Sequence, residues 1–135
     1  MTYEISKEFH FSASHQLDML PEGHQCARLH GHNYIVKVTL GSEELNDVGF
    51  VMDYGDLKFV STFIDSYLDH RHLNDVFGDT NPTAENMCVW FWDMIVEQLH
   101  HGDHSNNVEF VAVHISETPK TWAVYYRRIH DENTS

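Results

Sequence analysis

The chain has 135 residues, 41% of them hydrophobic, and a formal net charge of −13 with only eight lysines and arginines. This length predicts a single domain over residues 1–135, and the composition is sufficient for a packed core. The charge argues against nucleic acid as a partner, because such binding depends on a basic surface. The sequence contains no apolar run of membrane-spanning length, and we expect no signal peptide at its start, which favours a cytoplasmic protein with no membrane partner.

The first third of the chain predicts two strands joined by a long loop. Apolar and polar residues alternate from Tyr3 to His15 and again over residues 32–44, which is typical of half-buried strands. We expect these two strands to pair as an antiparallel hairpin. The connecting loop contains Pro21 and Gly23 and is long enough to carry functional residues.

Two helices are predicted next. Asp53 can cap a helix that extends to about residue 70, with apolar residues at helical spacing. Thr83 can cap a second helix over residues 84–100, which is apolar on nearly all sides and must therefore be well covered.

The last part of the chain returns to strand. Alternation is clear over residues 108–117 and 122–129, on either side of a turn at 118–121. The polar segment before these strands predicts a loop with three solvated histidines, His100, His101 and His104. The order ββααββ predicts an α+β fold, a four-stranded antiparallel sheet with two helices on one face.

Three histidines predict a metal site. His30 and His32 are two residues apart at the start of a strand, so both imidazoles leave the same face, and His15 ends the partner strand. The tripeptide HGH alone is more typical of a turn with two surface histidines than of a metal site. With His15, the nearby Cys26 and twelve histidines in total, we favour Zn²⁺ bound by three imidazoles, which leaves a fourth position open for catalysis.

The two cysteines have different expected roles. Cys26 lies four residues before His30, and a thiol beside a cation and imidazoles loses its proton more easily. It can act as a nucleophile or base, or instead as a fourth zinc ligand that closes the site. Cys88 lies on the apolar face of the second helix, where a small buried hydrophobic residue is expected.

Two further groups are candidates for catalysis or binding. Asp69 and His70 are adjacent, and an aspartate can orient an imidazole for acid/base work, although histidines are also common at helix ends for their charge alone. Glu117 ends a predicted strand, and structural and functional roles are equally compatible with that position.

Several short motifs together resemble the 6-pyruvoyltetrahydropterin synthase family. They occur in the order and approximate spacing of that family from about Phe9 to Tyr126: FSASH, a cysteine four residues before HGHNY, MDYGDLK, LDHRHLND, PTAEN with WFWD, and SET. The short C-x-x-x-H-G-H loop is similar to that of the bacterial branch, the 6-carboxytetrahydropterin synthases of queuosine and 7-deazapurine biosynthesis.

The resemblance implies a fold, an assembly and a set of roles. The fold would be the tunnelling fold, in which trimers close a barrel from their sheets and two trimers stack into a homohexamer. The substrate would be 7,8-dihydroneopterin triphosphate, a small-molecule pterin. The resemblance also implies roles for seven residues: zinc on His15, His30 and His32, catalysis by Cys26 with Asp69 and His70, and Glu117 anchoring the pterin ring.

Two features fit this resemblance less easily. His72 places an extra imidazole beside Asp69 and His70, and the charge of −13 is unfavourable for a triphosphate substrate. Local cations can outweigh distant carboxylates, which salt screens over about 8–10 Å; the candidates are Arg28, Lys37, Lys120, Arg127 and Arg128. Three alternatives stay open: a 6-pyruvoyltetrahydropterin synthase, a family member acting on another pterin, and a zinc-binding module without chemistry.

Overall fold

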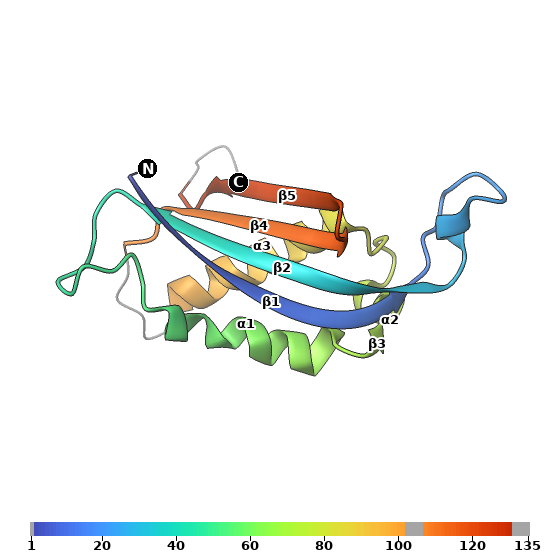
Figure 1. Cartoon of the computed structure of the whole chain (residues 1–135), viewed down its shortest axis with the longest axis horizontal. Coiled ribbons are helices and arrows are strands. Elements are labelled where there is room, and N and C mark those ends of the chain that lie inside the picture. Colours follow the sequence, from blue (N-terminus) through green and yellow to red (C-terminus); the bar gives the residue numbers. More distant parts are fainter. Residues whose placement is uncertain (1, 102–106, 131–135) are drawn as a thin grey trace.

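The strands of the described residues form one open sheet. A computed structural model describes residues 2–101 and 107–130. Within them, five strands lie in the spatial order β3-β1-β2-β4-β5 (Figure 1). Their bounds are β1 (Tyr3–His15), β2 (His30–Ser42), β3 (Arg71–His72), β4 (Phe110–Thr118) and β5 (Thr121–Arg128). The four long strands pair antiparallel, as the alternation predicted.

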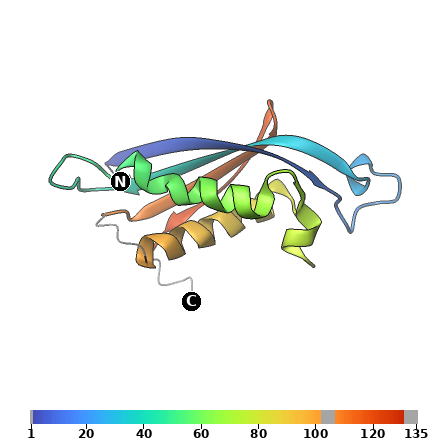
Figure 2. The ribbon, with the colours of Figure 1, turned by 90° about the horizontal axis from the view of Figure 1, so that it is seen from below.

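The helices lie together on one face of this sheet. Figure 2 shows α1 and α3 side by side beneath the strands, which leaves the opposite face of the sheet open. The helical segments are η1 (Gln25–Ala27), η2 (Tyr54–Leu57), α1 (Lys58–Phe63), η3 (Ile64–Leu68), α2 (Leu73–Phe77) and α3 (Ala84–His101), where η1 and η2 are 3-10 turns and η3 is a π-helical turn.

Both predicted helix caps are present. The Asp53 carboxylate accepts the N–H of Gly55 at 2.8 Å, at the start of η2. Thr83 Oγ1 accepts the N–H of Asn86 at 3.1 Å, at the start of α3. Each side chain satisfies a backbone donor that has no partner within its own helix.

The core lies between the covered face of the sheet and the helices. Strand positions at every second residue are buried, and their partners on the next strand point the same way, so Phe11 stacks on Tyr34 with ring centroids 4.8 Å apart. On α3, Phe91 and Ile95 are fully buried, and Trp92 donates its indole N–H to the Val111 carbonyl at 2.9 Å. Burial of these side chains positions the β1–β2 hairpin, which carries the site.

The segment after α1 differs from the prediction. The first helix ends at Leu68 rather than near residue 70, and the chain adds the short strand β3, parallel to β1, and the helix α2. The sequence did not predict these two elements because each is short. His70, with φ of +58°, turns the chain, and its N–H bonds the Ser12 carbonyl at 2.6 Å. Long-range bonds to β1 thus fix this segment.

The structure also differs from the prediction for the histidines near residue 100. His100 and His101 form the last turn of α3 rather than a loop, and both are exposed. Imidazoles at a helix C-terminus are compatible with the helix dipole. His104 lies outside the described residues. Within the part of the chain that the structure describes, no helix has both the length and the apolar character to cross a bilayer.

Candidate metal centre and active site

Three histidines converge at one end of the β1–β2 hairpin. In the antiparallel register His15 lies opposite His30, and Ala13 lies opposite His32. Opposed residues point to the same side of a sheet, and so do residues two apart on one strand. All three imidazoles therefore leave the covered face. One ring nitrogen from each lies within 4.8 Å of the other two.

Backbone carbonyls fix the orientation of two of the rings. His15 Nδ1 lies 2.8 Å from the Pro82 carbonyl oxygen, and His30 Nδ1 lies 2.7 Å from that of Arg28. A carbonyl can only accept, so each neutral ring carries its proton on Nδ1 and has a lone pair on Nε2. These two Nε2 atoms are 2.9 Å apart. Two lone pairs at this distance repel unless a cation or a proton lies between them.

The third ring presents a nitrogen without a partner. His32 Nε2 is buried and makes no hydrogen bond in the described structure, and it lies 3.7 Å from Glu117 Oε2. Leaving such an atom unsatisfied costs about 1–3 kcal/mol. Burial lowers the pKa of both His15 and His32, and it outweighs the opposing effects of the Pro82 hydrogen bond on His15 and of the Glu117 carboxylate on both rings. Neutral imidazoles are the form that binds metal ions.

The donor set fits a zinc ion. Zinc binds imidazole nitrogen at about 2.0–2.1 Å, so tetrahedral ligand nitrogens lie about 3.4 Å apart. The observed separations include one shorter distance of 2.9 Å and extend no further than 4.8 Å. These separations bracket the distance that tetrahedral coordination requires. In the described residues the cluster has three members, which leaves a fourth position for an exogenous ligand.

Tyr34 belongs to this site, although we predicted no role for it there from the sequence. Its hydroxyl lies 3.3 Å from His15 Nδ1, and burial raises its pKa, so it stays a neutral phenol. The signal was present in the strand alternation, since His30, His32 and Tyr34 are successive residues on one face of β2. The Pro82 carbonyl had no such signal, because its contact depends on the tertiary fold.

Asp69 and His70 form a pair just before β3, beside the edge of β1 that faces away from β2. His70 Nδ1 lies 3.0 Å from Asp69 Oδ2, and the Ser12 N–H donates to Asp69 Oδ1 at 3.0 Å. The Ser12 bond and then the His70 bond hold the pKa of Asp69 below its ordinary value, so the carboxylate stays charged. The His70 side chain is 82% exposed. The pair is therefore preorganised within one chain but opens onto solvent.

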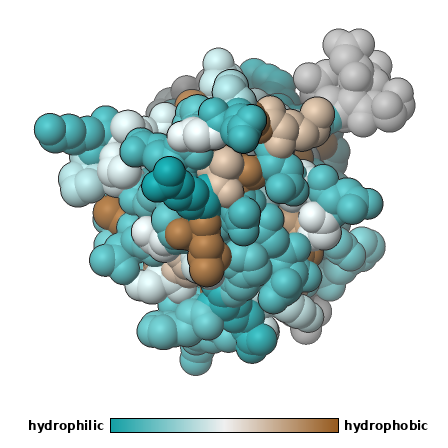
Figure 3. Space-filling model, turned by 90° about the vertical axis from the view of Figure 1, so that its right-hand side faces the viewer, coloured by the Kyte–Doolittle hydropathy of each residue, from teal (hydrophilic) through white to brown (hydrophobic). Residues whose placement is uncertain are grey.

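Cys26 lies in the loop between β1 and β2, which projects beyond the end of the sheet (Figure 1). Its N–H bonds His24 Nδ1 and its carbonyl accepts the N–H of Leu17, both at 3.0 Å. The residue is half-buried, and its thiol is not a member of the three-histidine cluster in the described structure. Viewed from the side that this loop projects toward, the surface is mostly hydrophilic, with a small apolar patch near the centre (Figure 3).

Glu117 connects the histidines with a neighbouring cavity. It lies near the end of β4, 3.7 Å from His32, and also lines a cavity of about 440 Å³ together with Glu85 and Trp122. A carboxylate with one side toward an imidazole and another toward an open cavity can bind a ligand that reaches both. The sequence placed Glu117 at a strand end but did not predict its proximity to the histidines.

These features define a small α+β protein with a three-histidine site that can hold a metal ion. A sequence model of the 6-pyruvoyl tetrahydropterin synthase family matches residues 4–128. The chain therefore belongs to the 6-pyruvoyl tetrahydropterin synthase family, and its fold is the tunnelling fold that the motifs implied, here as an open sheet in one chain.

Individual relatives are similar over most of the chain. It is 38% identical over 109 residues to a 6-carboxy-5,6,7,8-tetrahydropterin synthase of Synechocystis sp., covering 77% of this chain and 83% of the relative. It is 32% identical over 130 residues to a protein of the same name from Bacillus subtilis, covering 92% and 85%. The solved 6-pyruvoyl tetrahydropterin synthase of Caenorhabditis elegans has a TM-score of 0.70 and 29% identity, covering 93% of this chain and 95% of that one.

Proposed function

We propose that this protein is a zinc-dependent 6-carboxy-5,6,7,8-tetrahydropterin synthase of queuosine and 7-deazapurine biosynthesis. It converts 7,8-dihydroneopterin triphosphate to 6-carboxytetrahydropterin, acetaldehyde and triphosphate. The observation that carries the proposal is the pair of Nε2 atoms of His15 and His30, 2.9 Å apart, beside the unpartnered His32 nitrogen. The names of the Synechocystis and Bacillus relatives support this reaction over others in the family.

The metal and Glu117 have separate tasks in this proposal. His15, His30 and His32 hold zinc, which when bound polarises the side-chain oxygens of the substrate and makes their neighbouring protons more acidic. Glu117 accepts hydrogen bonds from the amino and ring N–H groups of the pterin. Two charge-assisted bonds to a planar edge fix the orientation of the ring and so place its side chain beside the histidines.

Cys26 and His70 carry out the proton transfers in this proposal. Cys26 takes a proton from the substrate side chain, and His70, oriented by Asp69 at 3.0 Å, serves as its acid/base partner. The exposure of the His70 ring fits a role at a site completed by a neighbouring subunit. We therefore assign Cys26 and His70 of one active site to two different chains.

The sheet favours such an assembly. β3 covers only Ala13 and Ser14 on the outer edge of β1, and β5 has no strand beyond it among the described residues. Unpaired edges cost least when subunits join them, and closing the sheet into a barrel removes both. Exposed Trp122 and Tyr126 on β5 add apolar surface beside one of these edges. We propose a homohexamer built from two such trimeric barrels.

One product assay tests the proposed reaction. Zinc-loaded protein is incubated with 7,8-dihydroneopterin triphosphate, acetaldehyde is measured with a coupled alcohol dehydrogenase, and the pterin product is identified by mass. Acetaldehyde together with 6-carboxytetrahydropterin is the expected result. Triphosphate release without acetaldehyde would instead assign the 6-pyruvoyl reaction, which the name of the Caenorhabditis elegans structure favours. Zinc binding without any product would leave a metal-binding module.

A further inference from the structure

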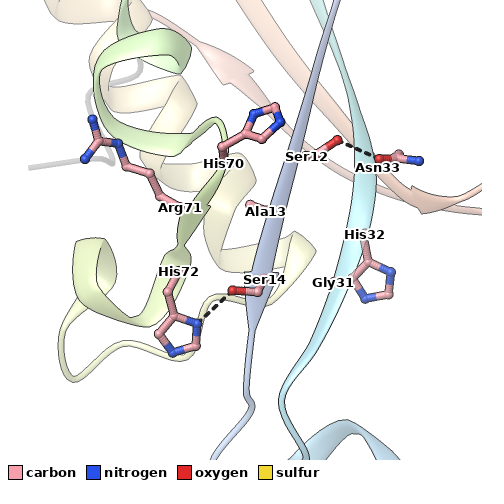
Figure 4. Close-up of a pocket in the computed structure, with 9 residues that line it drawn as sticks. All are labelled: Ser12, Ala13, Ser14, Gly31, His32, Asn33, His70, Arg71 and His72. Atoms are coloured by element: carbon pink, nitrogen blue, oxygen red, sulfur yellow. Dashed lines mark hydrogen bonds between the residues drawn. The ribbon is translucent and has the colours of Figure 1, made fainter.

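A hollow opens on the face of the sheet that the helices leave uncovered. Its volume is about 480 Å³, and Figure 4 shows its lining, with small polar residues on β1 and β2 and two imidazoles from the segment of β3. The polar residues of the lining are Ser12, Ser14, His32, Asn33, His70, Arg71 and His72. The lining includes no aspartate or glutamate, although the chain carries a net charge of −13.

Ser14 and His72 together present a hydrogen-bond donor to this hollow. Ser14 Oγ lies 3.0 Å from His72 Nδ1. If the hydroxyl donates, the neutral imidazole carries its proton on Nε2, which is then a free donor. If the imidazole donates instead, the hydroxyl hydrogen is free. In either arrangement one N–H or O–H of the pair is available to a bound acceptor.

Asn33 lines the hollow from β2, on the other side of β1 from His70 and His72. Ser12 Oγ donates to Asn33 Oδ1 at 2.6 Å, which fixes the orientation of the amide and leaves its NH₂ group as a donor (Figure 4). Gly31 on β2 also lines the hollow, and because it has no side chain it leaves the hollow open at that position. Arg71 extends from β3 on the side away from β1, so the donors that face β1 and β2 are neutral groups and imidazoles.

We propose that this hollow binds a phosphate-type oxyanion, with His72 and Ser14 as binding residues. A lining with hydroxyl, imidazole and amide donors and without a carboxylate suits a ligand that only accepts hydrogen bonds, and local donors outweigh distant charges that solvent screens. His72 is neither a proposed zinc ligand nor one of the proposed catalytic residues. Binding an oxyanion in this hollow would give this additional imidazole a function. Only the natural source of the oxyanion, the triphosphate tail of the substrate, rests on the proposed function.

Calorimetric titration with inorganic tripolyphosphate tests the pocket without any need for turnover. Ionic strength is held constant, and zinc-loaded and metal-free protein are compared because polyphosphates chelate zinc. His72→Phe keeps a planar ring and removes the nitrogens, and Ser14→Ala removes the hydroxyl. His10→Phe is the matched control, since His10 is an exposed histidine on the same strand that does not line the hollow.

We expect tripolyphosphate to bind the wild-type protein with and without zinc. Affinity should fall at least about tenfold in both His72→Phe and Ser14→Ala, the effect of losing one bond to a charged acceptor, and stay unchanged in His10→Phe. Orthophosphate titrated in parallel separates a single-phosphate site from one that needs a phosphate chain. Absence of binding, binding only to zinc-loaded protein, or equal affinity in all variants would overturn the pocket while leaving the proposed reaction untouched.

Discussion

The Nε2 atoms of His15 and His30 lie 2.9 Å apart, and each ring donates its Nδ1–H to a backbone carbonyl. The tautomer is thus set by atoms that a metal does not touch, as is common for metal-binding histidines. A cation bound between the two Nε2 atoms would satisfy both lone pairs at once. Metal binding and folding stability are therefore coupled at this end of the hairpin.

Zinc content separates the metal ligands from Cys26. His30→Ala should lose most of the bound zinc, because it removes one of three ligands, whereas Cys26→Ala should keep it. Metal per subunit is measured after dialysis against a weak chelator. The melting temperature should rise with added zinc in wild-type and Cys26→Ala protein but not in His30→Ala. Loss of zinc in Cys26→Ala would make the thiol a fourth ligand and contradict its assignment to chemistry.

Glu117→Gln tests the carboxylate between the histidines and the neighbouring cavity. The amide keeps the shape but loses the charge, so KM should rise about tenfold or more, the effect expected for charge-assisted hydrogen bonds. Zinc content should stay close to that of the wild type, since Glu117 lies 3.7 Å from His32 and is not one of the three nitrogen ligands. Glu8→Gln, which alters an exposed carboxylate on β1 that lines neither this cavity nor the histidine site, is the control and should leave KM unchanged.

The four long strands were predictable because a single physical signal, alternation of apolar and polar residues, determines which face each residue takes. The same signal placed His30 and His32 on one face, and pairing with β1 brought His15 opposite them. The prediction failed where structure depends on contacts far apart in the sequence. β3 exists because Ser12 bonds both Asp69 and His70, and no local pattern in LDHRHLND indicates that partner.

The three-histidine cluster was predictable from the sequence, whereas the contacts that support the site were not, and the catalytic roles stay predictions. The motif resemblance supplied Cys26, Asp69 and Glu117, and the structure adds how two of them are held: Asp69 by the Ser12 N–H and Glu117 beside His32. The carbonyl of Pro82 could not be predicted, because every residue has a carbonyl and only the tertiary fold selects the one that orients His15.

Asp69 should make stability depend on pH in the acid range. Its pKa is held below the ordinary value of 3.8 in the folded chain, so the charged form contributes stability that is fully present above that value and is lost as the pH falls through the lowered pKa. Asp69→Asn keeps an acceptor for the Ser12 N–H and removes the charge. Because the side chain is 32% exposed, we expect a loss of only about 0.5–1 kcal/mol at neutral pH.

Urea unfolding measures this difference at pH 7 and at steps down to pH 3, with protein concentration fixed because assembly contributes to stability. The difference in free energy of unfolding between wild-type and Asp69→Asn protein should be constant near neutrality. It should shrink toward zero as the pH falls below 3.8. Asp65→Asn, at an exposed position on η3, is the control and should show no such shrinking difference. A difference for Asp69→Asn that is independent of pH would mean that the lost stability does not come from the carboxylate charge.

Mixed oligomers test whether the active site is shared between chains. Cys26→Ala and His70→Ala proteins are each expected to be inactive, and they are unfolded and refolded together in equal amounts. If one chain supplies Cys26 and its neighbour supplies His70, random mixing gives an intact pair at about a quarter of the interfaces, and activity should recover to about that fraction of wild type. Each parent refolded alone is the control, and native mass spectrometry establishes that mixed oligomers have formed. Mixed oligomers as inactive as their parents would place both residues of a site in one chain and contradict the shared-site proposal.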